Sequence, residues 1–163
     1  MHTDSTRQFR SLMSRFVTGV TVLAVPDPHA PHDVVGMTAN AVSAVSLEPL
    51  LLLCCVRNKS SLLPRLAPGA SFSVNVLSSG QDAVSRYYGG QPERGEKGHW
   101  GLAESVPILK GANASFVCEV SSCMEAGDHT VIFGAVREMR SAEPPAPALV
   151  YACGRYSQVE LAN

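Results

Sequence analysis

The chain has 163 residues, of which 45% are apolar and 17% are charged. These values are typical of a single folded domain over residues 1–163 and exclude a disordered chain. The formal charge of −1 favours neither nucleic acid nor an anionic membrane as a partner. The longest apolar run, residues 50–56, is too short to span a bilayer, and residues 1–10 lack the apolar stretch of a signal peptide. We therefore expect a cytoplasmic protein.

Several kinds of site are disfavoured by what the sequence lacks. The five cysteines are odd in number and form no CxxC pair, so we expect reduced, buried thiols rather than a disulfide framework. His29 and His32 lie in a proline-rich loop without further ligands at a suitable spacing, so we expect no metal site. The P-loop spacing of residues 90–95 is followed by Glu96 instead of lysine, and GxGxxG, GxSxG and HExxH are absent.

The first predicted element is an amphipathic helix. Phe9, Leu12, Met13 and Phe16 recur at the spacing that places them on one helix face. Asp4 or Ser5 is a suitable N-cap, and Thr18-Gly19 ends the helical pattern.

The rest of the chain predicts short strands joined by turns. Gaps between strands mostly lack the helix that a parallel α/β sheet needs, so we expect an antiparallel β architecture, closed or sandwiched. The predicted elements are strands at 20–25 and 33–38 around a proline-rich loop at 26–31, a buried strand at 47–56, a helix start at 60–63, a strand at 71–77, a helix at 82–88, a surface loop at 89–101 that ends at Trp100, and strands at 115–121, 130–139 and 149–159.

Two segments combine residues suited to ligand binding. Small and hydroxyl-bearing residues cluster at 36–43, which lets a planar ligand approach the backbone, although composition alone favours an ordinary loop. Residues 57–61 place two cations and two hydroxyls after a buried strand, at a predicted helix start. That segment fits a phosphate site and a capped surface helix equally well.

A third segment carries a histidine. Gly127 and Asp128 predict a tight turn that presents His129 at the start of an apolar strand. Such a histidine can bind a ligand or transfer a proton, but a lone one at a strand start is more often a surface residue.

Taken together and in this order, these segments resemble the flavin reductase-like family. The resemblance extends over nearly the whole chain. It rests on Phe9-Arg10 and FVTGVTV at residues 16–22, GMTAN at 36–40, VSLEP at 45–49, FSVNVL at 72–77, GANASFVCEV at 111–120, GDH at 127–129 and Tyr151 with GRY at 154–156.

The resemblance implies a mainly β fold, the FMN-binding split β-barrel with antiparallel, Greek-key-like strands, in a homodimer with flavin near the subunit interface. It implies that residues 38–43 line the isoalloxazine ring and the ribityl chain, and that residues 57–61 bind the phosphate. His129 and Tyr156 are the implied catalytic residues on the nicotinamide side, where Arg10 also reaches. The implied flavin-binding residues are Thr38, Ala39, Asn40, Ala41, Ser43, Val56, Arg57, Asn58, Lys59, Ser60 and Ser61.

The implied activity is that of an NAD(P)H:flavin oxidoreductase. It reduces FMN, or FAD in its place, by direct hydride transfer from NADH or NADPH, and supplies reduced flavin to a partner monooxygenase. The cofactor carries this chemistry, so no acid–base pair is required and His129 orients the nicotinamide. Ala41 and Ser157 depart from the serine and histidine usual in the family. Two alternatives stay open, namely a flavin enzyme with its own organic substrate and a non-catalytic flavin- or haem-binding module.

Overall fold

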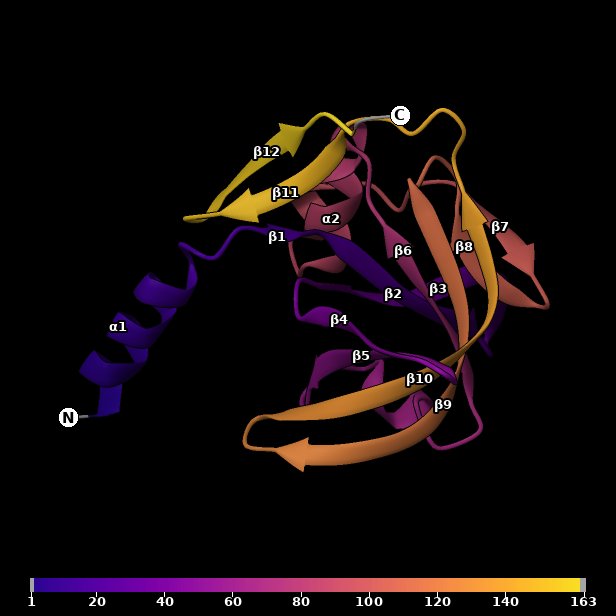
Figure 1. Cartoon of the computed structure of the whole chain (residues 1–163), viewed down its shortest axis with the longest axis horizontal. Coiled ribbons are helices and arrows are strands. Elements are labelled where there is room, and N and C mark those ends of the chain that lie inside the picture. The colour runs from indigo at the N-terminus through magenta and orange to yellow at the C-terminus, as the bar shows by residue number, and fades with distance from the viewer. Residues whose placement is uncertain (1, 162–163) are drawn as a thin grey trace.

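The computed structural model describes residues 2–161, apart from the side chains of residues 2, 3, 31 and 32. Its largest element is a curled antiparallel sheet with the strand order β3-β2-β6-β9-β10-β5-β4 (Figure 1). The strands are β2 (Thr21–Asp27), β3 (Ala30–Ala39), β4 (Val42–Leu47), β5 (Leu50–Arg57), β6 (Ser71–Val76), β9 (Ala114–Ala126) and β10 (His129–Ser141).

The two edge strands of this sheet are consecutive in the chain. β3 pairs with β2, β4 pairs with β5, and only Asn40 and Ala41 separate the end of β3 from the start of β4. Because the chain passes from one edge to the other within two residues, the sheet curls until its edges meet and closes a barrel. We call Asn40 and Ala41 the closing corner. The predicted mainly β, antiparallel architecture is confirmed.

The barrel interior is filled by side chains from alternate strand positions. Leu23, Phe72 and Ile132 have no exposed surface. Successive side chains of a strand point to opposite faces, so alternate positions of each strand enter this core. Gly134 lies against Phe72, and a Cβ at this position would come within 2.8 Å of the Phe72 Cζ atom. The close packing therefore requires glycine there.

A second layer covers one end of the barrel. Val20, Leu77, Val84 and Leu149 form a separate buried cluster that joins this layer to the barrel. Figure 1 shows the β11–β12 hairpin beside α2 at this end. The remaining elements are β1 (Thr18–Gly19), β11 (Ala148–Ala152) and β12 (Arg155–Val159) in one sheet, the hairpin β7 (Trp100–Ala103) and β8 (Val106–Leu109), α2 (Asp82–Tyr88), and the 3-10 helices Leu63–Arg65, Ser79–Gln81 and Pro92–Arg94.

The N-terminal helix, α1 (His2–Met13), stands away from the barrel (Figure 1). The prediction of a helix here is confirmed, but the helix begins before Asp4 and Ser5, so neither residue is its N-cap. Phe16 follows the helix instead of lying on it. The apolar face is uncovered, since Phe9 is 66% exposed and Leu12 is 54% exposed. In the part of the chain that the structure describes, no helix is both long and apolar enough to cross a membrane.

Several predicted elements have different boundaries in the structure. The buried strand predicted at 47–56 spans the turn between β4 and β5, and only alternate side chains of β5 are buried. The loop predicted at 26–31 is a short turn, because β2 runs to Asp27 and β3 begins at Ala30. Pro26 fits in β2 because β6 pairs only with Thr21–Ala24, so the missing N–H loses no ladder bond on that side. The strand predicted at 149–159 is a hairpin that turns at Cys153 and Gly154, both with positive φ. The helix predicted from residue 60 is only a turn before the 3-10 helix at Leu63–Arg65.

The cysteines are free thiols, as expected, but only some are buried. Cys54 and Cys118 lie in the barrel core, and burial raises the pKa of each thiol to about 12. Cys123 and Cys153 are exposed, which corrects the expectation of uniformly buried thiols.

Candidate functional site

A cavity of about 600 Å³ opens beside the closing corner. Arginine and lysine side chains line it, and none of the described lining residues is an aspartate or glutamate, so an anion is the ligand that its charge favours. Its size is in the range of cofactor pockets. The lining residues are Arg10, Met37, Thr38, Ala39, Asn40, Ala41, Cys55, Arg57, Lys59, Ser60, Tyr88, Gly89, Gly90, His129 and Tyr151.

The end of β5 supplies the cationic wall of this cavity. Arg57 ends the strand, and the chain turns as the Ser60 N–H donates to the Arg57 carbonyl over 2.9 Å. Among the described residues, neither Arg57 nor Lys59 forms a salt bridge. Their charges are therefore available to a phosphate, as one of the two interpretations of this segment required.

The β9–β10 turn brings His129 to the same wall. His129 is the first residue of β10 and pairs with Arg57 across the ladder. Gly127 has φ +66°, a conformation that glycine adopts without strain. His129 Nδ1 lies 2.8 Å from Asp128 Oδ1, and this hydrogen bond holds the pKa of Asp128 below its ordinary value. The contact fixes the ring through Nδ1, so Nε2 is the nitrogen that Asp128 does not engage.

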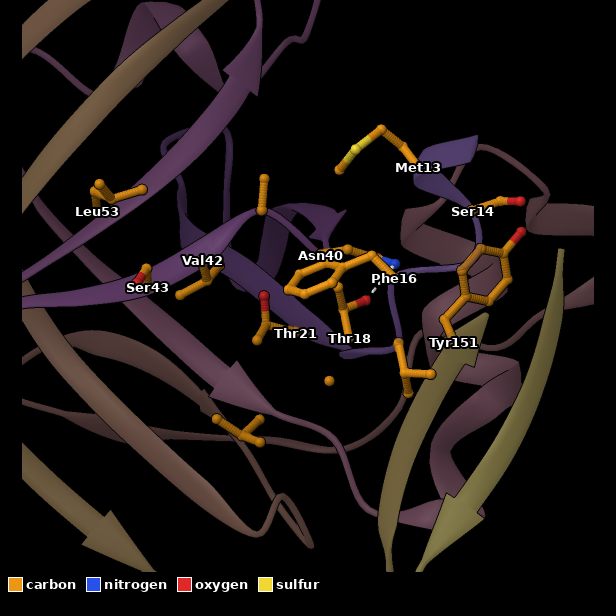
Figure 2. Close-up of a pocket in the computed structure, with 14 residues that line it drawn as sticks. Met13, Ser14, Phe16, Thr18, Thr21, Asn40, Val42, Ser43, Leu53 and Tyr151 are labelled. Carbon is orange, nitrogen blue, oxygen red and sulfur yellow. Dashed lines mark hydrogen bonds between the residues drawn. The ribbon is translucent and has the colours of Figure 1, made fainter. Parts of the chain in front are cut away.

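The closing corner is held by hydrogen bonds to separate elements. Asn40 Nδ2 donates to Thr18 Oγ1 over 3.1 Å, as the dashed line in Figure 2 marks. Thr38 Oγ1 donates to the Ser85 carbonyl over 2.7 Å, and the Ala41 carbonyl accepts the N–H of Cys55 over 3.0 Å. These bonds fix the backbone against which a flat ligand would lie.

A second, mainly apolar cavity of about 740 Å³ lies on the other side of this corner. Asn40, Ala41 and Tyr151 line both cavities. Figure 2 shows Phe16 and Tyr151 on one side of the apolar cavity, and Val42, Ser43 and Leu53 farther along it. Ser43 therefore belongs to the apolar cavity, and its hydroxyl donates to the Ala44 carbonyl.

Not every predicted site residue lies at the cationic cavity. Val56 is fully buried in the barrel core, and Ser61 lines neither of the two cavities. The Asn58 side chain is hydrogen-bonded to the β9–β10 turn.

Tyr156 packs behind another tyrosine. Tyr151 lines the cavity, and the two rings are 5.2 Å apart. The Tyr156 hydroxyl lies 2.8 Å from Ser85 Oγ, and the Arg86 guanidinium sits 4.9 Å from the centre of the Tyr156 ring. Tyr156 thus supports the wall that Tyr151 presents.

The C-terminal end of α2 forms a wall that sequence analysis missed. Tyr88, Gly89 and Gly90 line the cavity although no motif marks them. The Tyr88 ring packs edge-on against Trp100, and burial raises the pKa of Tyr88 to about 12. A Cβ on Gly36 would come within 2.8 Å of Tyr88 Cδ1, so this glycine was the available signal of a close approach.

Comparison with known sequences places this architecture among flavin-reducing proteins. The family model described as "Flavin reductase like domain" matches residues 13–160. The chain is 33% identical over 156 residues to the FMN reductase (NADH) SmoA of Agrobacterium fabrum, covering 95% of this chain and 87% of that protein. It is 36% identical over 143 residues to the reductase component of 4-hydroxyphenylacetate 3-monooxygenase from Thermus thermophilus, covering 88% and 89%.

Solved structures agree with the sequence comparison. The flavin reductase PheA2 superimposes with a TM-score of 0.86 at 34% identity, over 95% of this chain and 98% of that one. The NADH:FAD oxidoreductase SgcE6 of Streptomyces globisporus, in complex with NAD and FAD fragments, gives a TM-score of 0.83 at 31% identity, over 98% and 94%.

Proposed function

We propose, from the premise that this chain belongs to the flavin reductase-like family, that FMN binds in the cationic cavity with its ring at the closing corner. The chain is an oxidoreductase, an NADH-dependent flavin reductase that supplies reduced flavin to a monooxygenase. In this proposal residues 1–163 act as one flavin reductase-like domain. The placement of FMN rests on one observation: Arg57, Lys59 and His129 line the same cavity.

The charges of the cavity fit a phosphate monoester. Arg57 and Lys59 offer two positive charges, and Ser60 adds a hydroxyl. Arginine and lysine form charge-assisted hydrogen bonds with phosphate oxygens, which are stronger than neutral ones. FMN carries one such phosphate, so the residues present match the group.

The ring belongs at the closing corner. Thr38, Ala39, Asn40 and Ala41 line the cavity along the end of β3, where the hydrogen bonds described above fix the backbone. Small side chains at Ala39 and Ala41 leave room for a flat ring to approach the main chain. Preorganised backbone geometry lowers the entropy lost on binding.

His129 and Arg10 orient the nicotinamide. Both line the cavity, and the contact with Asp128 fixes the His129 ring through Nδ1. When bound, the flavin supplies the N5 atom that accepts hydride from the reduced nicotinamide. The residues then contribute position and exclusion of water, so no proton transfer by His129 is needed.

The working form in this proposal is a homodimer. Phe9 and Leu12 of α1 are exposed, and so is Leu47 of β4, at 81%. A contiguous apolar helix face that its own barrel does not cover is typical of an interface. The apolar cavity adjoins α1 through Met13, its last residue, and Phe16 just after it, and the cavity shares the closing corner with the flavin site. A second copy docking there would therefore lie beside the flavin.

The direct test follows flavin and nicotinamide absorbance under argon after the purified protein is mixed with FMN and NADH. We expect bleaching of many equivalents of added FMN, with FAD and NADPH as parallel runs. FMN binding without bleaching by either nucleotide would contradict the reductase activity.

A second experiment tests the phosphate site with Lys59→Ala. We expect about a tenfold weaker affinity for FMN, and a smaller change for riboflavin, which lacks the phosphate. Equal losses for both flavins would contradict the phosphate site.

A further inference from the structure

Asn58 lies between two cavity-lining cations but does not line the cavity itself. Its neighbours Arg57 and Lys59 do. The side-chain amide of Asn58 is instead bonded to the β9–β10 turn, 69 and 72 residues later in the chain. An amide in a phosphate site would keep its donors free for oxygen atoms, so these contacts indicate another role.

Three hydrogen bonds join Asn58 to the turn that carries His129. The Asn58 Nδ2 group donates to the Gly127 carbonyl over 3.1 Å, and the Asn58 backbone N–H donates to the Asp128 carbonyl over 3.0 Å. The Thr130 hydroxyl donates to Asn58 Oδ1 over 2.9 Å. The bonds reach the residues on both sides of His129, so Asn58 spans the turn from before the histidine to after it.

These bonds connect the segment after β5 with the β9–β10 turn, and residues of both line the cavity. Residues 58–60 follow the end of β5. Among the described residues, His129 also contacts its strand partners and Asp128. Asp128 is almost fully exposed, so its contact with His129 is open to competition from water. Thr130 is buried, so its bond to Asn58 is better shielded than the one made by Asp128.

We propose that Asn58 is a positioning residue, which holds the 127–130 turn so that His129 meets the nicotinamide at a fixed distance from the phosphate-binding cations. The proposal rests on the role given to His129 under Proposed function. It also replaces the expectation that Asn58 itself binds the flavin phosphate.

Two variants separate the positioning of the 127–130 turn by Asn58 from a general loss of stability. Asn58→Ala removes both side-chain bonds, and Thr130→Val removes one hydroxyl while keeping the shape of the side chain. Thr130→Ser is the matched control, because it restores the hydroxyl. Each variant is compared by kcat and KM for NADH, by FMN affinity, and by amide hydrogen exchange of residues 127–130 measured by NMR.

We expect kcat/KM for NADH to fall about tenfold in Asn58→Ala and about threefold in Thr130→Val, with FMN affinity within about twofold of the wild type. Exchange of the turn amides should accelerate in both variants, and Thr130→Ser should recover the wild-type values. A large loss of FMN affinity in Asn58→Ala with unchanged NADH kinetics would overturn the proposal, because it would make Asn58 a phosphate ligand.

A His129→Ala variant, measured alongside, distinguishes a failure of the role proposed for His129 from a failure of the role proposed for Asn58. Wild-type NADH kinetics in His129→Ala would contradict the role proposed for His129. Wild-type exchange rates in Asn58→Ala would instead contradict the hold of Asn58 on the turn, whatever His129 does. Faster exchange with unchanged NADH kinetics, in a protein that His129→Ala does impair, would also overturn the positioning role.

Discussion

Leu23, Phe72 and Ile132 of the barrel have no exposed surface, whereas Phe9 and Leu12 of α1 expose more than half of theirs. Both sets follow a regular apolar pattern in the sequence. In the barrel, strand pairing within the same chain brings the apolar faces together. The helix has no such pairing. The spacing of its apolar residues therefore shows that one face is apolar, but not what covers that face. The difference teaches that burial in this chain follows from partners, and that the barrel of the same chain does not cover the apolar face of α1.

The largest effect is expected from breaking the barrel interior. Phe72→Ala removes a fully buried ring and should lower the free energy of unfolding by about 3–5 kcal/mol, as measured by urea denaturation. Leu102→Ala is the matched control, because Leu102 is 64% exposed, and it should change stability by less than about 0.5 kcal/mol. Equal effects of the two substitutions would remove the distinction between interior and surface.

The face of α1 should respond in association instead of in folding. Replacing Phe9 and Leu12 together by serine should raise the dimer dissociation constant at least about 100-fold, or about 2.7 kcal/mol, by sedimentation equilibrium. The near-ultraviolet circular dichroism of the barrel should stay unchanged. Gln8→Ser, on the same helix, should leave the dimer intact. A wild-type protein that sediments as a monomer would contradict the proposed role of this face.

A small addition to the core sharpens the same contrast. Gly134→Ala places a methyl group 2.8 Å from Phe72 Cζ and should lower the free energy of unfolding by about 1–3 kcal/mol. In a Phe72→Ala background the nearest clashing atoms are absent and the 3.1 Å approach to Cys118 Cβ remains, so the second substitution should lower stability much less. Additive losses in this double-mutant cycle would show that the two sites do not act on each other.

The smallest effect concerns an exposed ion pair. Lys97 Nζ lies 2.7 Å from Asp33 Oδ2, and this hydrogen bond holds the pKa of Asp33 below its ordinary value. A lowered carboxyl pKa stabilises the fold above the ordinary pKa, and that contribution is lost as the pH falls through the lowered value. Lys97→Met should therefore unfold at slightly lower urea than the wild type at pH 6, and the two should converge near pH 2. A difference that persists at pH 2 would rule out the ion pair as its cause.

Elements with a clear strand or helix pattern could be predicted from the sequence. The strand predicted at 71–77 is β6 (Ser71–Val76), and the helix predicted at 82–88 is α2 (Asp82–Tyr88). The pattern failed where side chains are small or where Gly and Pro intervene. β4 has a mixture of small and apolar residues. β7, which contains Gly101, overlaps the loop predicted at 89–101, and β8, which contains Pro107, has no predicted counterpart.

The candidate site was predictable where its residues follow one another in the chain. Arg57, Lys59 and Ser60 form a local cluster, and His129 follows a recognisable turn. Tyr88 and Gly90 were not predicted, because they reach the cavity only through the packing of α2 against β3, far away in sequence. Asn58 shows the same limit, since nothing near it in the sequence indicates that its amide bonds a turn 69 residues away.

The closing corner has a thermodynamic consequence. The same two residues, Asn40 and Ala41, close the barrel and line both cavities. A ligand that requires the closed corner binds the native chain and not the unfolded one, so its binding stabilises the closed barrel. Ligand at about one hundred times its dissociation constant would add about 2.7 kcal/mol to the stability of the native state. The unfolding temperature of this protein would then depend on the concentration of flavin, and a cell with little flavin would contain a less stable barrel.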